Sequence, residues 1–530
     1  MKIETSKLDE ADIEATNSGP ITDLPEYDKA HSTRKLCVAG IWFSTLLGLS
    51  CLATCGPVFQ HRIHGDDTQG AYLLRAPSFM GHIISLCINI VVAACTDVLG
   101  YVHATSLRWT LVQEGRLEYN SNLRLFTSSK HTWANGKLVN TLSGVFLALS
   151  YTASSQLLIL YDESGMNEAQ TLYVNGIALI TLGVGLSGLS AVAILSLSTQ
   201  KAAILTWSPN PLDTALACVH NEVLHRRPGR GMMSVNMATL SAQPITASAL
   251  QRPARDSYKQ IKTMARLIWV ALVISGILTG VVCGLSAYLN PDSPKTWVFF
   301  GLDGNTYLNF FIAGPNTLTD DQQSLICLVL FFLFGLGLQA SICVPLHCME
   351  LIVNVTRDET AWRHATTEKG ASLHTSGLKG AFQSWQWWIL FAMKPFAQWL
   401  FTSASVWSIY ENTEVLVCVN AIPLAVLTGV MIFLTFLGEH MARKRQNGPQ
   451  PVAYGHLQTI VDLIDDWGEG SKKPLYWGVK HSVAGAMPRV GTSGSHIIVT
   501  PVENETISSF STEAQPSLTT EITKSFINSR

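Results

Sequence analysis

Long apolar runs alternate with polar connections along this 530-residue chain. A helix needs about 20 predominantly apolar residues to cross a hydrocarbon core roughly 30 Å thick. Eight segments reach that length, at approximately 36–56, 79–101, 138–160, 172–196, 264–288, 324–350, 386–409 and 414–437. The pattern therefore predicts an all-α, polytopic integral membrane protein with about eight transmembrane helices.

The connections between these segments differ in their content of Lys and Arg. Short cytoplasmic loops retain positive charge. The two termini and every second connection together hold 31 Lys and Arg, whereas the alternate connections hold only Arg62, Arg75 and Lys295. This asymmetry predicts that the N- and C-termini are both cytosolic. The expected parts are a cytosolic tail, an eight-span membrane domain with one long cytosolic loop, and a second cytosolic tail, at 1–35, 36–437 (loop 197–263) and 438–530.

The cytosolic segments are expected to differ in order. Loop 197–263 is rich in proline and is predicted to be largely irregular or disordered. Residues 456–467 repeat apolar positions at helical spacing, with acidic residues off that stripe, which predicts a short amphipathic helix. Its acidity favours docking on the protein's own basic loops or on a cytosolic protein partner over an anionic membrane surface. Beyond about Ser482 the chain is Ser/Thr-rich and is predicted to be disordered.

Two apolar segments carry glycines at regular spacing. Segment 172–196 contains GVGLSG, which matches a dinucleotide-binding pattern, but no strand is expected before it and it lies inside an apolar run. We therefore interpret these small residues as sites of close helix contact. Gly276, Gly280 and Gly284 form a similar ridge. Its neighbour is either another helix of this chain or a second copy in a homo-oligomer.

Composition narrows the class further. Only 14% of the residues are charged, against about 25% in ordinary soluble domains, and the net charge of −2 argues against a nucleic-acid partner. Motifs for metal hydrolysis, nucleotide binding or an α/β-hydrolase nucleophile are missing from the sequence. The sequence therefore indicates the lipid bilayer as a partner and predicts no catalytic residue, no cofactor and no metal site.

Three motifs resemble a known group of proteins. They are TSLRWTLVQEGRLEYNSNLRLFTSSK, YGHLQTIVDLIDDW and KPLYWGVK, beginning at Thr105, Tyr454 and Lys473. The chain resembles multi-pass membrane proteins of filamentous fungi whose activity is not established, and the spans between the motifs occur in a similar order. This resemblance implies a fungal source and residence in a membrane, and it assigns no role to any residue.

Ionisable side chains inside the predicted spans are candidates for function. Such groups cost about 2.5–3.5 kcal/mol each at a helix centre on insertion scales. Under the predicted topology Asp97, Glu350 and Lys394 meet at a similar depth. They form either part of a substrate or ion pathway, together with His82, Asn89 and Gln339, or a pair that only fixes helix register while Lys394 extends its ammonium to the interface.

The loop after the second span is the other candidate site. Arg108, Trp109, Arg116 and Arg124 are residue types expected at headgroup level. We expect the three arginines to contact lipid phosphates or a carboxylate on a substrate. The simpler interpretation is an interfacial helix that ends in a turn.

Three functional classes follow. A transporter or channel-like protein for a small solute or metabolite is the first hypothesis, because of the buried charges. The alternatives are a membrane scaffold, sensor or partner-binding protein, and a membrane-embedded enzyme on a lipid-like substrate, for example in secondary metabolism. Inverted repeats would favour transport, but spans one to four and five to eight show no correspondence in the sequence. Plasma membrane and endomembrane are not distinguished.

Overall fold

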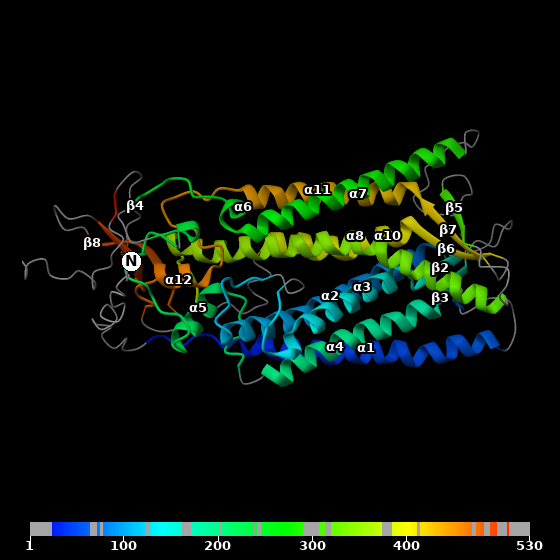
Figure 1. Ribbon diagram of the computed structural model, residues 1–530, viewed down its shortest axis with the longest axis horizontal. Helices are drawn as coiled ribbons and strands as arrows, with labels where there is room; N and C mark the ends of the chain where they lie inside the picture. The colour runs from blue at the N-terminus through cyan, green and yellow to red at the C-terminus, as the bar shows by residue number, and fades with distance from the viewer. Residues whose placement is uncertain are drawn as a thin grey trace, which may run out of the picture.

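The structure is a computed structural model in which eight long helices form an elongated bundle (Figure 1). It describes residues 24–63, 71–74, 78–122, 127–161, 171–200, 203–237, 239–240, 245–289, 307–312, 320–373, 384–410, 414–468, 473–481, 488–495 and 506–507. The eight long helices of this part of the chain are α1 (His31–Ile63), α2 (Ser78–Gln113), α3 (Lys137–Gln156), α4 (Gly176–Gln200), α7 (Lys259–Leu289), α8 (Asp320–Arg363), α10 (Trp385–Ala404) and α11 (Ala421–Arg443).

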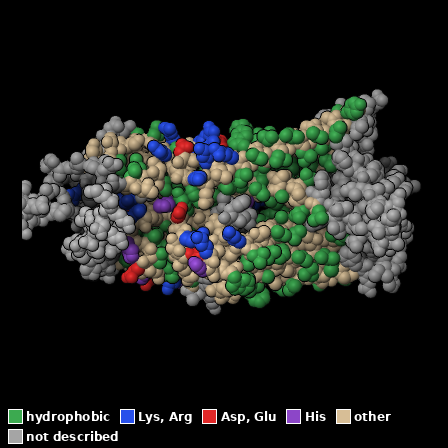
Figure 2. Space-filling model, in the orientation of Figure 1, with side chains coloured by type: hydrophobic (Ala, Val, Ile, Leu, Met, Phe, Trp, Pro, Cys, Tyr) green, Lys and Arg blue, Asp and Glu red, His purple; other side chains and the backbone are tan. Residues whose placement is uncertain are grey.

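Six of these helices, α1, α2, α4, α7, α8 and α11, are long and apolar enough to cross a membrane. The prediction of a mainly helical chain with several apolar helices is therefore confirmed. Outward-facing side chains such as Phe43, Val273 and Phe436 are exposed. Hydrophobic side chains cover one half of the molecule in Figure 2, and charged ones gather toward the other end. The two 20-residue helices α3 and α10 pack among the six and bury polar side chains such as Ser154 and Gln398.

Short strands, which the apolar pattern does not predict, form two three-stranded antiparallel sheets at one end of the bundle (Figure 1). The first sheet has the order β1 (Ala71–Leu74), β3 (Thr171–Asn175), β2 (Leu158–Tyr161), and the second has the order β5 (Tyr307–Ile312), β7 (Glu414–Asn420), β6 (Ser405–Tyr410). The predicted boundaries of the last two spans are therefore wrong, because α10 ends at Ala404 and α11 begins at Ala421. The segments SVWSIY and EVLVCVN are rich in β-branched and aromatic residues, which favour strands.

The two halves of the bundle repeat one topology. Each half consists of a helix, a strand, two helices, two strands and a helix, over residues 31–200 and again over 259–443. The strand order is also the same, and in each half the fourth helix packs against the first and the third. Both halves begin at the end of the bundle opposite the sheets and therefore run in the same direction (Figure 1).

Individual residues mark the same correspondence where the third strand of each half meets the fourth helix. The sequences there are VNGIAL and VNAIPL. Asn175 Oδ1 accepts a hydrogen bond from the backbone N–H of Ile177 at 3.0 Å, and Asn420 Oδ1 accepts one from Ile422 at 3.2 Å. Asparagine is a favoured residue at this capping position. The two halves therefore start their fourth helix in the same way.

Two buried tryptophans extend the match to the other end of the bundle. The indole N–H of Trp109 donates to the carbonyl of Thr206 at 2.9 Å, and that of Trp362 donates to Pro451 at 2.9 Å. Each tryptophan lies at the end of the second helix of its half, and each acceptor follows the fourth helix. The expectation that the halves show no correspondence is therefore wrong. The repeats are parallel rather than inverted, and these capping residues and buried anchors preserve them in the sequence.

Glycines behave differently in α4 and α7. A Cβ at Gly183 would lie 2.9 Å from the carbonyl oxygen of Gly48 on α1, and one at Gly185 would lie 3.1 Å from that of Phe146 on α3. The predicted packing role of the GVGLSG segment is therefore confirmed, although β3 does precede α4. At Gly276, Gly280 and Gly284 no described atom other than the neighbouring backbone of α7 itself lies within 4 Å of the equivalent position. That ridge makes no contact within the described chain, and contact with a second copy stays a prediction.

The end of the bundle opposite the sheets is covered by a folded region that we call the cap. It contains α5 (Pro211–His220), α12 (Leu457–Leu463), β8 (Tyr476–His481) and β9 (Arg489–Ser493). Much of loop 197–263 is irregular as predicted, but it also contains α5, whose residues 211–218 are buried. Asn210 caps this helix by accepting from the backbone N–H of Leu212 at 3.0 Å, and a proline at the first helical position suits a helix start.

The predicted amphipathic helix at 456–467 forms as α12. Its residues Leu457, Ile460 and Val461 are at most 1% exposed in the core of the cap. Asp462 accepts from Arg227 Nη2 at 2.6 Å. Of the two expected docking modes, α12 adopts contact with the protein's own basic loop, and its apolar face is already covered.

Lowering the pH is expected to weaken the cap through His456. This residue caps α12 in its neutral form, with Nδ1 accepting from the backbone N–H of Thr459 at 3.2 Å. Burial, helped by Arg227, lowers the pKa of His456 to about 4. The neutral imidazole contributes its full stabilisation above the unfolded-state pKa of about 6.5, and this contribution is lost as the pH falls through the folded-state pKa of about 4. At pH 5 the stability lost is about 2 kcal/mol. Hydrogen exchange of α12 at pH 7 and pH 5 measures the loss.

His456→Asn is the matched control, because asparagine caps a helix without titrating in this range. Burial raises the pKa of Asp213 to about 8, so its protonation acts in the opposite direction. The difference between wild type and His456→Asn isolates the histidine. An unchanged pH dependence in His456→Asn would contradict the prediction.

Candidate functional site

Lys394 on α10 lies in a charged cluster inside the bundle. Its Nζ is 2.7 Å from Oδ1 of Asp97 on α2 and 3.3 Å from Oε2 of Glu350 on α8. Nδ1 of His347 is 3.5 Å from the same oxygen of Glu350. The lysine side chain is only 9% exposed. The structure thus brings together the three charged residues that the sequence singled out, and Lys394 does not extend away from them.

The two acids of the cluster occupy equivalent places in the two halves. Asp97 lies twelve residues before Trp109, and Glu350 lies twelve residues before Trp362. Lys394 has no such counterpart, since the residue at the same position of α3, counted from the helix start, is Phe146. The cluster therefore combines a symmetric pair of carboxylates with a single cation.

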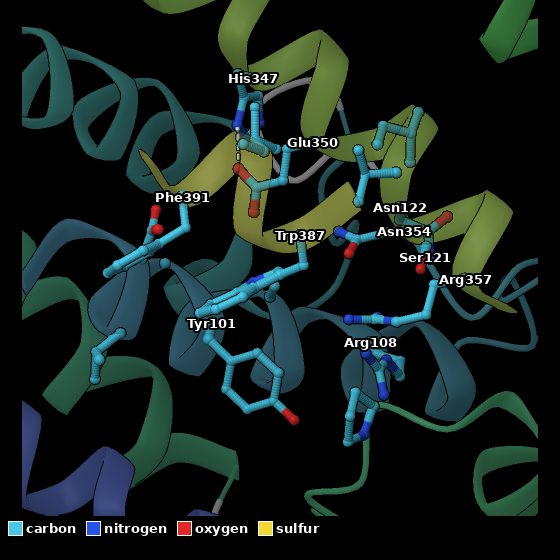
Figure 3. A pocket seen from close by; sticks show the side chains of 18 of the residues that line it. Tyr101, Arg108, Ser121, Asn122, His347, Glu350, Asn354, Arg357, Trp387 and Phe391 are labelled. Carbon is cyan, nitrogen blue, oxygen red and sulfur yellow. Dashed lines mark ion pairs between the residues drawn. The ribbon is translucent and has the colours of Figure 1, made fainter. Parts of the chain in front are cut away.

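A cavity of about 350 Å³ extends from this cluster toward the cap. Glu350 lies at one end of it, and Arg108 and Arg357 lie at the other (Figure 3). Asp97 and Lys394 also line it, beside Glu350 in the cluster. Helices α1, α2, α8 and α10 form its walls through side chains that include Leu36, Val98, Tyr101, Trp387 and Phe391. The cavity therefore lies between the two halves and has charged groups at both ends.

A second, much smaller cavity of about 20 Å³ lies on the opposite side of the cluster. Tyr151, Cys343 and Gln398 line it together with the charged residues. This volume suits about one water molecule. Gln339 donates to Gln398 beside it, so Gln339 joins the polar groups of this region as predicted. The charged cluster therefore separates a large cavity on the cap side from a small polar space on the sheet side.

Two further predicted pathway residues lie toward the sheets. Asn89 Oδ1 accepts from Ser154 on α3 at 2.9 Å, and Asn89 Nδ2 donates to the carbonyl of Ser85 at 2.9 Å. His82 packs edge-on against Trp399 of α10, with 6.4 Å between ring centroids. Together with Asp97 they place polar groups along about 22 Å of α2. The structure shows that they share the bundle interior with the cluster, although neither lines the large cavity.

The predicted headgroup contacts of Arg108 and Trp109 are wrong. Arg108 is 8% exposed and Trp109 is 1% exposed. Residues 203–210 return across the end of α2, and Arg108 Nη1 donates to the carbonyl of Ser208 at 3.1 Å. The returning backbone supplies the polar partners that a headgroup was expected to supply. Arg108 lines the cavity, and its contact with a substrate carboxylate stays a prediction.

The structure describes Arg116, one of the other two predicted residues of that loop, but not Arg124. Arg116 is 37% exposed and forms an ion pair with Glu114 at 2.7 Å. Serine and backbone donors hold the Glu114 carboxylate, and its pKa is lowered to about 2 against the effect of burial. Arg116 therefore stabilises the loop. Arg124 lies outside the described residues.

Sequence reasoning missed Arg357 and Asp358. The sixth span was expected to end at residue 350, whereas α8 continues to Arg363. Asp358 is fully buried and accepts from Ser121 at 2.8 Å and from Asn120 at 3.1 Å. The apolar positions Ile352, Val355 and Trp362 continue at helical spacing and could have revealed the longer helix.

No family model, no curated protein and no solved structure matches this chain. Its class therefore follows from the fold and the site alone. The described chain is a mainly helical protein with six helices able to cross a membrane, built from two parallel halves with a charged cavity between them.

Proposed function

We propose that this chain is an eight-span membrane protein with both termini in the cytosol that transports a small solute or metabolite. Helices α3 and α10 complete the set of eight, because each has 20 residues and packs among the six apolar helices. Their polar side chains face the bundle interior, which is where a transport path needs them. The Lys- and Arg-rich connections lie at the cap end, so the cap is the cytosolic side.

The buried Lys394 at the end of the large cavity is the observation that carries this proposal. An ionised side chain within the hydrocarbon region is costly, and such residues commonly mark substrate or ion paths. Its partners Asp97 and Glu350 come from different halves. Transporters built from repeats place their sites near the interface between the repeats. The position of this cluster agrees with that arrangement.

The two halves suggest how access alternates. A rocking motion of one half against the other would change the distance between Asp97 and Lys394, which belong to different halves. The larger cavity lies on the cap side of the cluster, and the small polar space at Gln339 and Gln398 lies on the other side. The cluster is then the boundary that opens and closes between the two sides.

A membrane scaffold or sensor is the second candidate function, and the folded cap favours it. The cap has its own core, which includes Trp362 and Trp477. However, the apolar face of α12 is covered within the chain, so a cytosolic partner would need another surface. A membrane-embedded enzyme draws no comparable support from the described residues.

Metabolite profiles of cells and medium are expected to change when the cluster is neutralised. The variant combines Asp97→Asn, Glu350→Gln and Lys394→Met, so that no charge is left without its partner in the fold. Untargeted profiling compares this strain with one lacking the protein. A compound that shifts between cells and medium in both strains supports transport through the cluster.

Lys262→Met is the matched control, because this lysine is exposed at the start of α7. Its profile should equal that of wild type. A well-folded triple variant with a wild-type profile would reject the pathway and leave the cluster a structural role.

A further inference from the structure

We propose that the cap end of the large cavity binds the anionic group of a small organic anion, a carboxylate or a phosphate ester, between Arg108 and Arg357. This inference rests on the proposed transport function and names the class of its substrate. The two arginines come from α2 and α8 and therefore from different halves. Both line the cavity, and in Figure 3 their guanidinium groups point toward the same part of it.

The charges around the two arginines do not balance locally. The acid next to them is Asp358, whose Oδ1 is 3.9 Å from Arg357 Nη2, too far for a direct hydrogen bond. Its Oδ2 already accepts from Ser121 and Asn120. Within the described residues Arg108 has no carboxylate within 4.0 Å, and its hydrogen bond to Ser208 uses a neutral carbonyl. Two cations thus share one distant acid.

An anion that carries a carboxylate or a phosphate group is a suitable partner for the two guanidinium groups. Arginine presents five N–H donors in a planar fork that matches carboxylate and phosphate oxygens. The amide of Asn354 lines the same end of the cavity and can donate to a further oxygen of the anion (Figure 3). An anion placed here would reduce the repulsion between the two arginines and connect the two halves of the bundle.

The rest of the cavity indicates an organic rather than an inorganic anion. Its volume of about 350 Å³ falls in the range of pockets for small organic ligands. Trp387 and Phe391 stack with 5.0 Å between their ring centroids and form an aromatic wall, and Val98 and Leu36 add apolar surface. The ligand that fits has an anionic head toward the cap and an apolar or aromatic body toward Lys394.

Binding to the purified full-length protein tests this site. The probes are 1-naphthoate, 1-naphthyl phosphate and the neutral 1-naphthamide, which share one ring system. Quenching of tryptophan fluorescence reports binding, because Trp387 lines the cavity. We expect at least one of the two anions to bind, and the amide to bind about 10- to 100-fold more weakly because it lacks charge-assisted hydrogen bonds. The anion that binds more tightly distinguishes a carboxylate site from a phosphate site.

Arg357→Gln should weaken the binding of the preferred anion about 10- to 100-fold and leave binding of the amide unchanged. Arg357→Lys should retain part of the affinity, because it keeps the charge without the fork. Arg443→Gln is the control, since this arginine is 65% exposed and outside the cavity. Equal binding of anions and amide, or full affinity in a folded Arg357→Gln protein, would overturn the site.

The outcomes also separate this inference from the proposed function. Anion binding that depends on Arg357, without any change in metabolite distribution, would support the site and reject transport. A change in metabolite distribution that depends on the cluster, without anion binding, would reject the site and leave the transport proposal standing.

Discussion

Lys394→Met is expected to lower the free energy of unfolding by about 1–3 kcal/mol, because it removes the buried cation and leaves the carboxylates of Asp97 and Glu350, which are 28% and 35% exposed, without their partner. The substitution removes the cation that lies 2.7 Å from Asp97 and 3.3 Å from Glu350. Two carboxylates then face each other across the interface between the halves. Methionine fills a volume similar to that of the lysine stem, so the lost charge rather than a cavity dominates the effect. Thermal unfolding of the purified protein in detergent measures it.

Neutralising all three residues is expected to recover most of the stability that the single Lys394→Met substitution removes. Replacing a whole buried ion cluster by well-packed apolar residues is often nearly neutral for stability, and the amides at 97 and 350 stand where the side chains are 28% and 35% exposed and can reach water. The triple variant with Asp97→Asn and Glu350→Gln should therefore unfold close to wild type, and the coupling between the sites should exceed about 1 kcal/mol. Lys262→Met should have no effect. A single variant as stable as wild type would show that the cluster bears little energy.

Gly183→Val is expected to lower the free energy of unfolding by about 1–3 kcal/mol, the range for overpacked interiors. The new Cβ would lie 2.9 Å from the backbone oxygen of Gly48 and 2.7 Å from Leu52 Cγ. A backbone oxygen cannot rotate away as a side chain can, so α1 and α4 must separate. That separation also disturbs the contact of α4 with α3. Thermal unfolding and the yield of folded protein report the effect.

Gly280→Val supplies the control in α7. Both glycines lie inside apolar helices, so helix propensity changes equally. No described atom other than the neighbouring backbone of α7 itself lies within 4 Å of a Cβ at Gly280, and stability should remain within about 0.5 kcal/mol of wild type. Equal losses of stability in the two variants would mean that the effect comes from helix propensity and not from contact between helices. A change in oligomeric state with Gly280→Val would instead support the predicted homo-oligomer.

The helical bundle could be predicted because lipid imposes a simple length rule. Apolar length placed helices over all eight predicted segments, and the cost of charge in such segments drew attention to Asp97, Glu350 and Lys394. Their meeting also followed from topology, since a consistent direction of each span sets the depth of every residue. These inferences need only one-dimensional information.

The remaining features depend on contacts between distant segments. Trp109 looks like an interfacial anchor until residues 203–210 fold back across it. Loop 197–263 looks irregular because its proline content hides α5, whose burial depends on α12 and the rest of the cap. Strands β1 and β5 pair with β3 and β7 across about 100 residues of chain, and the pattern within one strand does not state its partner. Sequence patterns therefore predicted the long helices better than they predicted the cap and the cavity.

The repeated topology has a consequence for the ancestry of the protein. Two four-helix halves that face the same way are what fusion of two copies of one subunit produces, so the ancestral subunit would have paired with itself. In that symmetric dimer the two equivalent acids, now Asp97 and Glu350, would have placed two like charges near each other. The position of Lys394 is occupied by Phe146 in the other half, and this difference could arise only after fusion had allowed each copy to diverge. The single cation at Lys394 is thus an asymmetry that a homodimer cannot encode.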